Sequence, residues 1–241
     1  MKKYMLNWLM VFVGLVAIVS LFFVFRHKKQ NRVCKEVIVE YADNDAALIS
    51  AQSILEQLKR DTVPTVGLKT TEVPLKRVEK SLRGNVFVKN AEGYFDFEGN
   101  LHLKIYQRKP IVRVHPDVGN PYYLDDSGKR IPLSKLHTPR VKTASGNISS
   151  VLDKKLYTFV NHVNQSEFWD KFIDHIFVRP NNDLVFTTQI GGHEVVFGDT
   201  LRMEQKLNKL EEFYEKASKN VGWEQYSEID IRFKNQIVCR K

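Results

Sequence analysis

The chain has 241 residues, of which 43% are hydrophobic and 27% are charged, a composition typical of folded domains and unlike that of a disordered chain. Its formal net charge is +9, but residues 1–35 hold seven Lys or Arg and no acidic residue, so residues 36–241 hold 30 basic against 28 acidic residues, or +2. This near-neutral body lacks the concentrated basic face of a nucleic-acid-binding domain. We therefore expect no nucleic-acid partner, and two cysteines exclude a disulfide framework.

Residues 5–25 are predicted to form a single transmembrane helix. The stretch carries no charge, and at about 1.5 Å per residue it rises roughly 31 Å, which matches the hydrocarbon core of a bilayer. A cleaved signal peptide is the alternative, but its apolar region is usually shorter, and no convincing cleavage site follows Ala17. Residues 1–4 would then be a short N-terminus and residues 26–35 a basic linker. The flanking positive charges favour a cytoplasmic C-terminus by a margin of about one charge.

Residues 36–110 are predicted to begin with a strand at 36–41, where apolar and polar residues alternate, followed by a helix that starts at the capping residues 43–45 and runs towards Lys59. A second helix is indicated by apolar residues at spacings of three and four between Pro74 and Gly84.

The same unit ends in a predicted hairpin. The period changes to two in residues 86–97 and 101–106, and Gly99-Asn100 between them suits a tight turn. The order strand, helix, helix, strand, strand is that of a POTRA-like domain.

Residues 111–241 are predicted to form a mixed β domain with helices, which makes the whole chain α+β. Two strands lead into the turn Asp125-Asp126-Ser127-Gly128, and Ser150 with Asp153 resembles a capping box at the start of a helix. A second helix is expected at 200–218. The remaining strands are expected at 175–178, 183–190, 193–197, 226–233 and 236–240.

The sequence offers no candidate catalytic, metal-binding or cofactor-binding residues. It has no zinc-protease, nucleophile-elbow, phosphate-loop or Cys-x-x-Cys motif, and no two of its seven histidines have ligand spacing. Asp125 and Asp126 are interpreted as turn residues rather than as paired catalytic carboxylates. Cys239 is interpreted as a buried small side chain and Cys34 as an unpaired thiol, with a disulfide between them as the alternative.

Three segments in order carry a family resemblance. Residues 107–114 read Gln-Arg-Lys-Pro-Ile-Val-Arg-Val, residues 123–128 read Tyr-Leu-Asp-Asp-Ser-Gly, and residues 226–233 read Tyr-Ser-Glu-Ile-Asp-Ile-Arg-Phe. They are similar to the Glu-Arg-x-Pro-Val-Ala, Leu-Leu-Asp-x-x-Gly and Tyr-x-x-Val-Asp-Leu-Arg-Tyr segments of the FtsQ (DivIB) family of bacterial cell-division proteins. With the preceding POTRA-like order, the chain resembles the form of this family found in Bacteroidetes-like bacteria.

The resemblance implies a non-enzymatic divisome protein in the cell inner membrane, anchored by a single pass at residues 5–25, with a cytoplasmic N-terminus and a periplasmic body. We adopt this orientation over the weak charge argument. The partners that the resemblance implies are FtsB- and FtsL-type bitopic division proteins, with the septal peptidoglycan synthase complex as the machinery regulated. In the family, the partner adds a strand to the edge of the last strand, a mode that draws affinity from main-chain hydrogen bonds.

The candidate partner-binding residues lie at the end of the chain. Arg232 matches the family's binding Arg, and Phe233 stands where relatives have Tyr, so a hydrogen bond from that hydroxyl would be missing here. Alternation directs Ile229, Ile231 and Phe233 to one side of the predicted strand. An extended partner segment is then expected to pair with Gln236, Ile237, Val238 and Cys239.

Three other interpretations remain open at this point. The last strand could be an ordinary core component with solvated polar residues. The chain could be a membrane-anchored envelope enzyme acting on peptidoglycan precursors, since its size and topology fit equally well. A POTRA-like unit could also serve outer-membrane assembly, although such proteins usually carry several copies and a membrane barrel.

Overall fold

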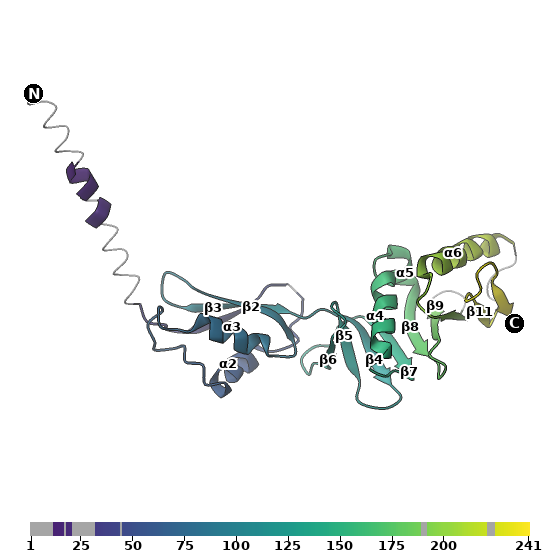
Figure 1. The fold of residues 1–241 in the computed structure, drawn as a ribbon, viewed down its shortest axis with the longest axis horizontal. Helices are drawn as coiled ribbons and strands as arrows, with labels where there is room; N and C mark the ends of the chain where they lie inside the picture. Colours follow the sequence, from purple (N-terminus) through teal and green to yellow (C-terminus); the bar gives the residue numbers. More distant parts are fainter. Residues whose placement is uncertain (1–11, 17, 21–31, 44, 189–191, 221–224) are drawn as a thin grey trace, which may run out of the picture. The chain divides into compact units, whose positions relative to one another are not determined.

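The computed structural model describes residues 12–16, 18–20, 32–43, 45–188, 192–220 and 225–241, and it divides into two compact units, Met1–Gln107 and Arg108–Lys241 (Figure 1). Most of the predicted transmembrane stretch 5–25 lies outside the described residues. Among the residues that are described, no helix has both the length and the apolar character needed to cross a bilayer.

The first unit has the predicted order of strand, helix, helix, strand, strand. Its three-stranded sheet has the order β1-β3-β2, with β1 parallel and β2 antiparallel to the central β3. The two helices cover one face, where they enclose a core that includes Ile54, Val78, Leu82, Leu103 and Ile105. The elements are β1 (Val37–Tyr41), α2 (Ala51–Arg60), α3 (Leu75–Arg83), β2 (Val88–Phe95) and β3 (Leu101–Gln107).

The predicted start of the first helix at residues 43–45 is wrong. Helix α2 begins at Ala51, and the Ser50 hydroxyl caps it by accepting from the Ser53 amide at 3.1 Å. The preceding segment is held in a non-helical conformation by tertiary contacts, because the Leu48 amide donates to the Gln107 side chain at 2.7 Å and the Tyr41 hydroxyl donates to the Ile49 carbonyl at 2.6 Å. The second helix has its predicted ends, with Pro74 before it and Gly84 after it.

The predicted hairpin around Gly99-Asn100 is confirmed, and the side chain of Asp96 fixes its turn. One carboxylate oxygen accepts from the amides of Glu98, Gly99 and Asn100, each at 2.8 Å. Gly99 has φ +96°, and a Cβ there would lie 2.8 Å from the Val33 carbonyl oxygen, so both backbone conformation and space favour glycine.

His102 on β3 links the three strands of the first unit on the solvent side of the sheet. Its Nδ1 lies 2.7 Å from Glu40 of β1 and its Nε2 lies 3.2 Å from Asp96, while the ring of Tyr94 stacks on it at 5.1 Å. The hydrogen bond with Glu40 is the main cause of a raised His102 pKa, although partial burial opposes it. Protonated His102 therefore ties both outer strands to the central one.

Replacement of His102 by Gln should destabilise the first unit more at pH 5.5 than at pH 8. A group whose pKa is raised on folding contributes stability that is fully present below its unfolded pKa and is lost as the pH rises through the folded pKa. We expect a loss of about 1 kcal/mol at pH 5.5 and a smaller loss at pH 8. Hydrogen exchange of the β1 and β3 amides measures it, and an equal loss at both pH values would contradict the charged hydrogen bond.

The second unit is built on a nine-stranded mixed sheet of the described residues, in the order β12-β11-β10-β9-β8-β7-β4-β5-β6. Two of its three parallel pairs are joined through helices, since α4 and α5 connect β7 to β8 and α6 connects β10 to β11, whereas β4 reaches β7 through β5 and β6. The strands are β4 (Pro110–Pro116), β5 (Tyr122–Asp125), β6 (Arg130–Pro132), β7 (Lys142–Gly146), β8 (Ile173–Val178), β9 (Leu184–Thr188), β10 (Glu194–Gly198), β11 (Glu228–Asp230) and β12 (Val238–Arg240). The helices are α4 (Leu152–Val163), α5 (Glu167–Phe172) and α6 (Met203–Asn220).

The three helices lie along one face of this sheet (Figure 1) and bury one continuous core against it. Phe159 of α4 contacts the rings of Phe186 on β9 and Phe197 on β10 at centroid distances of 5.9 and 4.8 Å. Leu207 and Leu210 of α6 belong to the same cluster. Strand β7 and the short helix α5 were not predicted as elements, because neither has a clear period of its own.

Asp125 forms the predicted turn. Its Oδ1 accepts from the amides of Ser127 and Lys129 at 2.9 and 2.8 Å, and its Oδ2 accepts from Arg108 at 2.7 Å. Burial alone would raise the pKa of this fully buried carboxyl, but these hydrogen bonds outweigh burial and lower it. Its lone pairs hold the turn between β5 and β6, as expected for a structural carboxylate.

The predicted capping box at Ser150 and Asp153 is wrong. Val151 is the N-cap residue of α4, and no side chain caps the helix there. Asp153 instead accepts from the Tyr122 hydroxyl at 2.5 Å and forms an ion pair with Arg130, whose guanidinium lies 4.2 Å from the Tyr122 ring centre. The carboxylate therefore fastens the β5–β6 hairpin to the first turn of the helix.

Candidate functional site

The end of the chain forms one edge of the nine-stranded sheet. Strand β12 pairs antiparallel with β11, in a register that places Arg240 opposite Glu228 and Val238 opposite Asp230. Strand β11 in turn pairs parallel with β10. In the part of the chain that the structure describes, β12 has β11 as its single neighbour, so its outer edge faces no strand.

The register determines which main-chain groups of β12 point outward. The Ser227 carbonyl accepts from the Glu194 amide, and the Ile231 amide donates to the Val196 carbonyl, so Ile229, which lies between them in β11, directs its N–H and C=O towards β10. The Ser227 amide, just before the strand, instead donates to the Arg240 carbonyl of β12. Even-numbered residues of β11 therefore bond to β12, and Cys239, opposite Ile229, is in a non-hydrogen-bonded pair. The N–H and C=O of Cys239 consequently point to the open edge, whereas those of Val238 point to β11.

The side chain of Lys209, from helix α6, holds the turn that leads into β12. Its Nζ donates to the carbonyls of Ile231 and Gln236, each at 3.1 Å, and to that of Phe233. Burial and the nearby charges of Arg202 and Lys206 lower the pKa of Lys209. The loop between β11 and β12 is thus held in part by a side chain of α6.

Arg232 is already engaged by two carboxylates of its own chain. Its Nη1 donates to Asp183 at 2.8 Å, and its Nε and Nη2 donate to Asp230 at 3.0 and 2.5 Å. The hydrogen bonds with Asp230 raise the pKa of Arg232; in return they lower the pKa of Asp230, although burial alone would raise it. The Arg232 side chain is 39% exposed. A partner could therefore contact its guanidinium only while that group is bonded to Asp183 and Asp230.

Phe233 does not continue the apolar face of the strand as predicted. Ile229 and Ile231 are fully buried in the core, but β11 ends at Asp230 and Phe233 is 45% exposed in the following loop. The chain turns there because Arg232 folds back onto Asp230 and Lys209 gathers the loop carbonyls. Phe233 instead lines a small basic depression with Arg202, Gln205, Lys206, Lys209, Arg232 and Lys234.

The remaining predicted site residues lie before and within β12. Gln236 and Ile237 precede the strand, and Val238 and Cys239 belong to it. Ile237 and Cys239 are partly buried against the core of the second unit. Both cysteines are free thiols, and they belong to different units of the structure.

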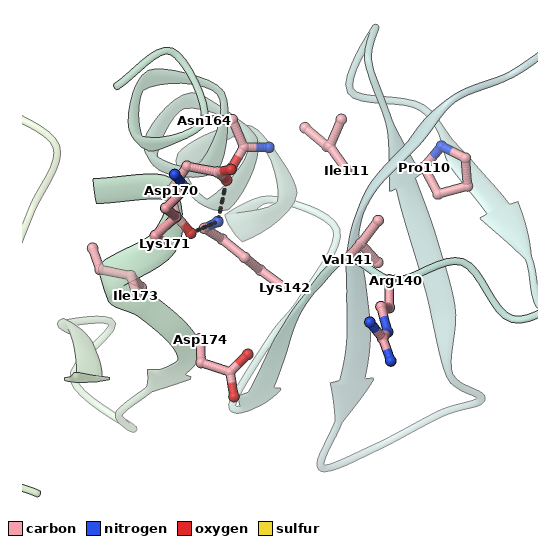
Figure 2. Close-up of a pocket in the computed structure, with 10 residues that line it drawn as sticks. All are labelled: Pro110, Ile111, Arg140, Val141, Lys142, Asn164, Asp170, Lys171, Ile173 and Asp174. Carbon is pink, nitrogen blue, oxygen red and sulfur yellow. Dashed lines mark hydrogen bonds and ion pairs between the residues drawn. The ribbon is translucent and has the colours of Figure 1, made fainter. Parts of the chain in front are cut away.

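A second feature, which sequence reasoning did not find, is a pocket of about 340 Å³ in the second unit (Figure 2). At its floor the buried Lys142 amine donates to the Asp170 carbonyl at 2.7 Å and to its carboxylate at 2.5 Å. Arg140 and Asp174, both exposed, also line it. The residues that line the pocket come from four separate segments, 110–111, 140–142, 164 and 170–174, so no spacing in the sequence could reveal them. The Asp170 carboxylate in this pocket is therefore engaged by an ion pair with Lys142.

No group of three or more potential metal ligands is gathered within the described ranges.

Substitution of Lys209 by Met should loosen the end of the sheet. The apolar stem keeps its packing, but three carbonyls lose their shared donor, so we expect the opening free energy of β11 and β12 to fall by about 1 to 3 kcal/mol. Hydrogen exchange of these strands measures the change. Lys216 on the same helix is exposed and bonds to Glu212 at 3.4 Å, so K216M is the matched control with an expected change below about 0.5 kcal/mol. Equal exchange in the two variants would contradict the role of Lys209.

Comparison with known families agrees with this division of the chain. Residues 109–240 match the family model described as FtsQ/DivIB, C-terminal related, and residues 32–106 match that of a POTRA-like domain. A search of curated proteins found no match.

Proposed function

Because the chain belongs to the FtsQ/DivIB family of bacterial cell-division proteins, we propose that it is a non-enzymatic scaffold that receives an extended segment of a bitopic FtsB- or FtsL-type partner at the open edge of β12. The observation that carries this proposal is the outward-pointing N–H and C=O of Cys239 on an edge strand. An incoming strand would satisfy these groups and continue the sheet.

The partner-binding residues in this proposal have different roles. Cys239 and, two residues before it, Ile237 form the line along which the partner strand pairs. Gln236, whose carbonyl accepts from Lys209, leads into this line. Val238 holds β12 to β11. Arg232 acts as a positioning residue, because it keeps Asp230 neutralised beside the edge, and exposed Phe233 offers a ring on which partner side chains can pack.

The setting of this function is also part of the proposal. Residues 5–25 would anchor the chain in the inner membrane by a single pass, with the N-terminus in the cytoplasm and both folded units in the periplasm. By holding its partners there, the protein would help to regulate the septal peptidoglycan synthase complex. The uncharged 21-residue length of this stretch supports the anchor.

Proline substitutions test the outer and the inner edge of β12 separately. Pro has no N–H, so C239P removes an outward donor and should weaken binding of the FtsB-type partner by about tenfold or more while the fold persists. V238P removes a donor to β11 and should open the strand pair itself. Affinity is measured by titration of the partner into the purified full chain, with hydrogen exchange as the test of folding.

The matched control is C239A, which changes the side chain but keeps the N–H, and it should bind like the unsubstituted chain. If folded C239P binds the partner with unchanged affinity, strand addition at this edge is wrong. If C239A loses as much affinity as C239P, the thiol side chain rather than the main chain is recognised, which also contradicts the proposal.

A further inference from the structure

The three-stranded sheet of the first unit has two edges, and they differ in how far their main-chain groups are covered. The outer edge of β2 is occupied by side chains of α3. The Gly93 amide donates to Glu79 at 3.1 Å, and the Ala91 carbonyl accepts from Arg83 at 3.3 Å. Glu79 and Arg83 also face each other at 3.8 Å. Two of the outward groups that an incoming strand would need are therefore already bonded.

The outer edge of β1 carries no such cover among the described residues. The Glu36 carbonyl accepts from Leu101, and the Ala42 amide donates to the Ile105 carbonyl, so the even-numbered residues of this parallel pair bond to β3. The N–H and C=O groups of Val37, Val39 and Tyr41 then point away from the sheet. No strand of the described chain pairs with this side of β1.

The open stretch has defined ends. Before β1, a loop occupies the outer edge. The Cys34 amide donates to the Leu68 carbonyl at 2.8 Å, and the Cys34 carbonyl accepts from the Gly67 amide at 2.9 Å. After Tyr41 the chain bends at Ala42 and Asp43. An incoming strand therefore has room for the five residues Val37–Tyr41 and must leave the edge beyond them.

We propose that a second copy of this chain fills the edge, with the two β1 strands antiparallel about a two-fold axis at Val39. In this register Val37 faces Tyr41 of the other copy and Val39 faces its own counterpart. All three outward-pointing residues then form hydrogen-bonded pairs, because odd-numbered residues meet odd-numbered residues. This contact is independent of the β12 edge.

The charges at the two ends of β1 favour a second copy over an unrelated strand. Lys35 precedes the strand and Asp43 follows it. In the antiparallel arrangement each Lys35 therefore lies at the end of the strand pair where Asp43 of the other copy lies, and opposite charges come near each other at both ends. A parallel arrangement would bring like charges together instead.

Cysteine crosslinking tests this register. Ile38 of one copy would lie opposite Glu40 of the other as a non-hydrogen-bonded pair, with about 4.5 Å between Cα atoms, which is within disulfide range. Full-length I38C and E40C chains, each also carrying C239A, are oxidised separately and as a mixture, and covalent dimers are read on non-reducing gels. We expect at least about fivefold more dimer in the mixture than in either chain alone. In a dimer of one variant, the two cysteines would be offset by two residues along the strands and would lie too far apart to form a disulfide.

The matched control is a mixture of N90C and E92C chains, which places cysteines at the same spacing on the covered β2 edge.

A second test uses K35D and D43K, each of which should reduce crosslinking of the I38C and E40C mixture, whereas the double exchange should restore it. V39P removes an outward N–H but no bond to β3, so it should abolish crosslinking with the β1–β3 hydrogen exchange unchanged.

A mixture that crosslinks no better than the single chains, or no better than the β2 control, overturns the proposal. So does crosslinking that K35D and D43K both leave unchanged, or an I38C and E40C yield that appears only when a different protein is added. Loss of partner binding at β12 in the C239P chain has no bearing on this result, since β1 belongs to the other unit.

Discussion

The parallel pairing of β10 with β11 determines what the end of this chain can do. Because the odd-numbered residues of β11 bond to β10, its even-numbered residues are committed to β12, and Cys239 is left with its main-chain groups turned outward. A shift of one residue in that register would turn Val238 outward and bury a different set of side chains. The crossover through α6 fixes the register, since Leu207 and Leu210 of that helix pack into the same core as Ile229.

Helix α6 also supports the turn after β11. It therefore both positions β11 and holds the loop between β11 and β12. Lys209 gathers three carbonyls that a short, irregular loop could not satisfy by itself. The open edge is in this way presented on a rigid support, which reduces the ordering that a partner strand would have to impose on binding.

Much of the fold follows from local pattern. The two helices and hairpin of the first unit were predicted because Pro74, Gly84 and Gly99 mark ends that backbone geometry requires, and Asp125 marks a turn for the same reason. The start of α2 was missed because the residues before it are fixed by long-range hydrogen bonds, such as that from Leu48 to Gln107, which leave no trace in local sequence. The terminal strands were correctly predicted as a pair, but the first of them was predicted to be too long. The alternation of Ile229, Ile231 and Phe233 continues in the sequence beyond the point where Arg232 turns back onto Asp230 and the strand ends.

Arg232 shows why a matching residue and its role must be considered separately. Asp230 is buried beside the edge strand, and a buried carboxylate that loses its ion-pair partner destabilises a protein by several kcal/mol. A substitution of Arg232 would therefore disturb β11, and with it the register of β12, before any contact with a partner is considered. Loss of binding in such a variant is expected from the internal ion pair alone. The main-chain groups of Cys239 provide the cleaner test, because they point outward and the ladder between β11 and β12 does not depend on them.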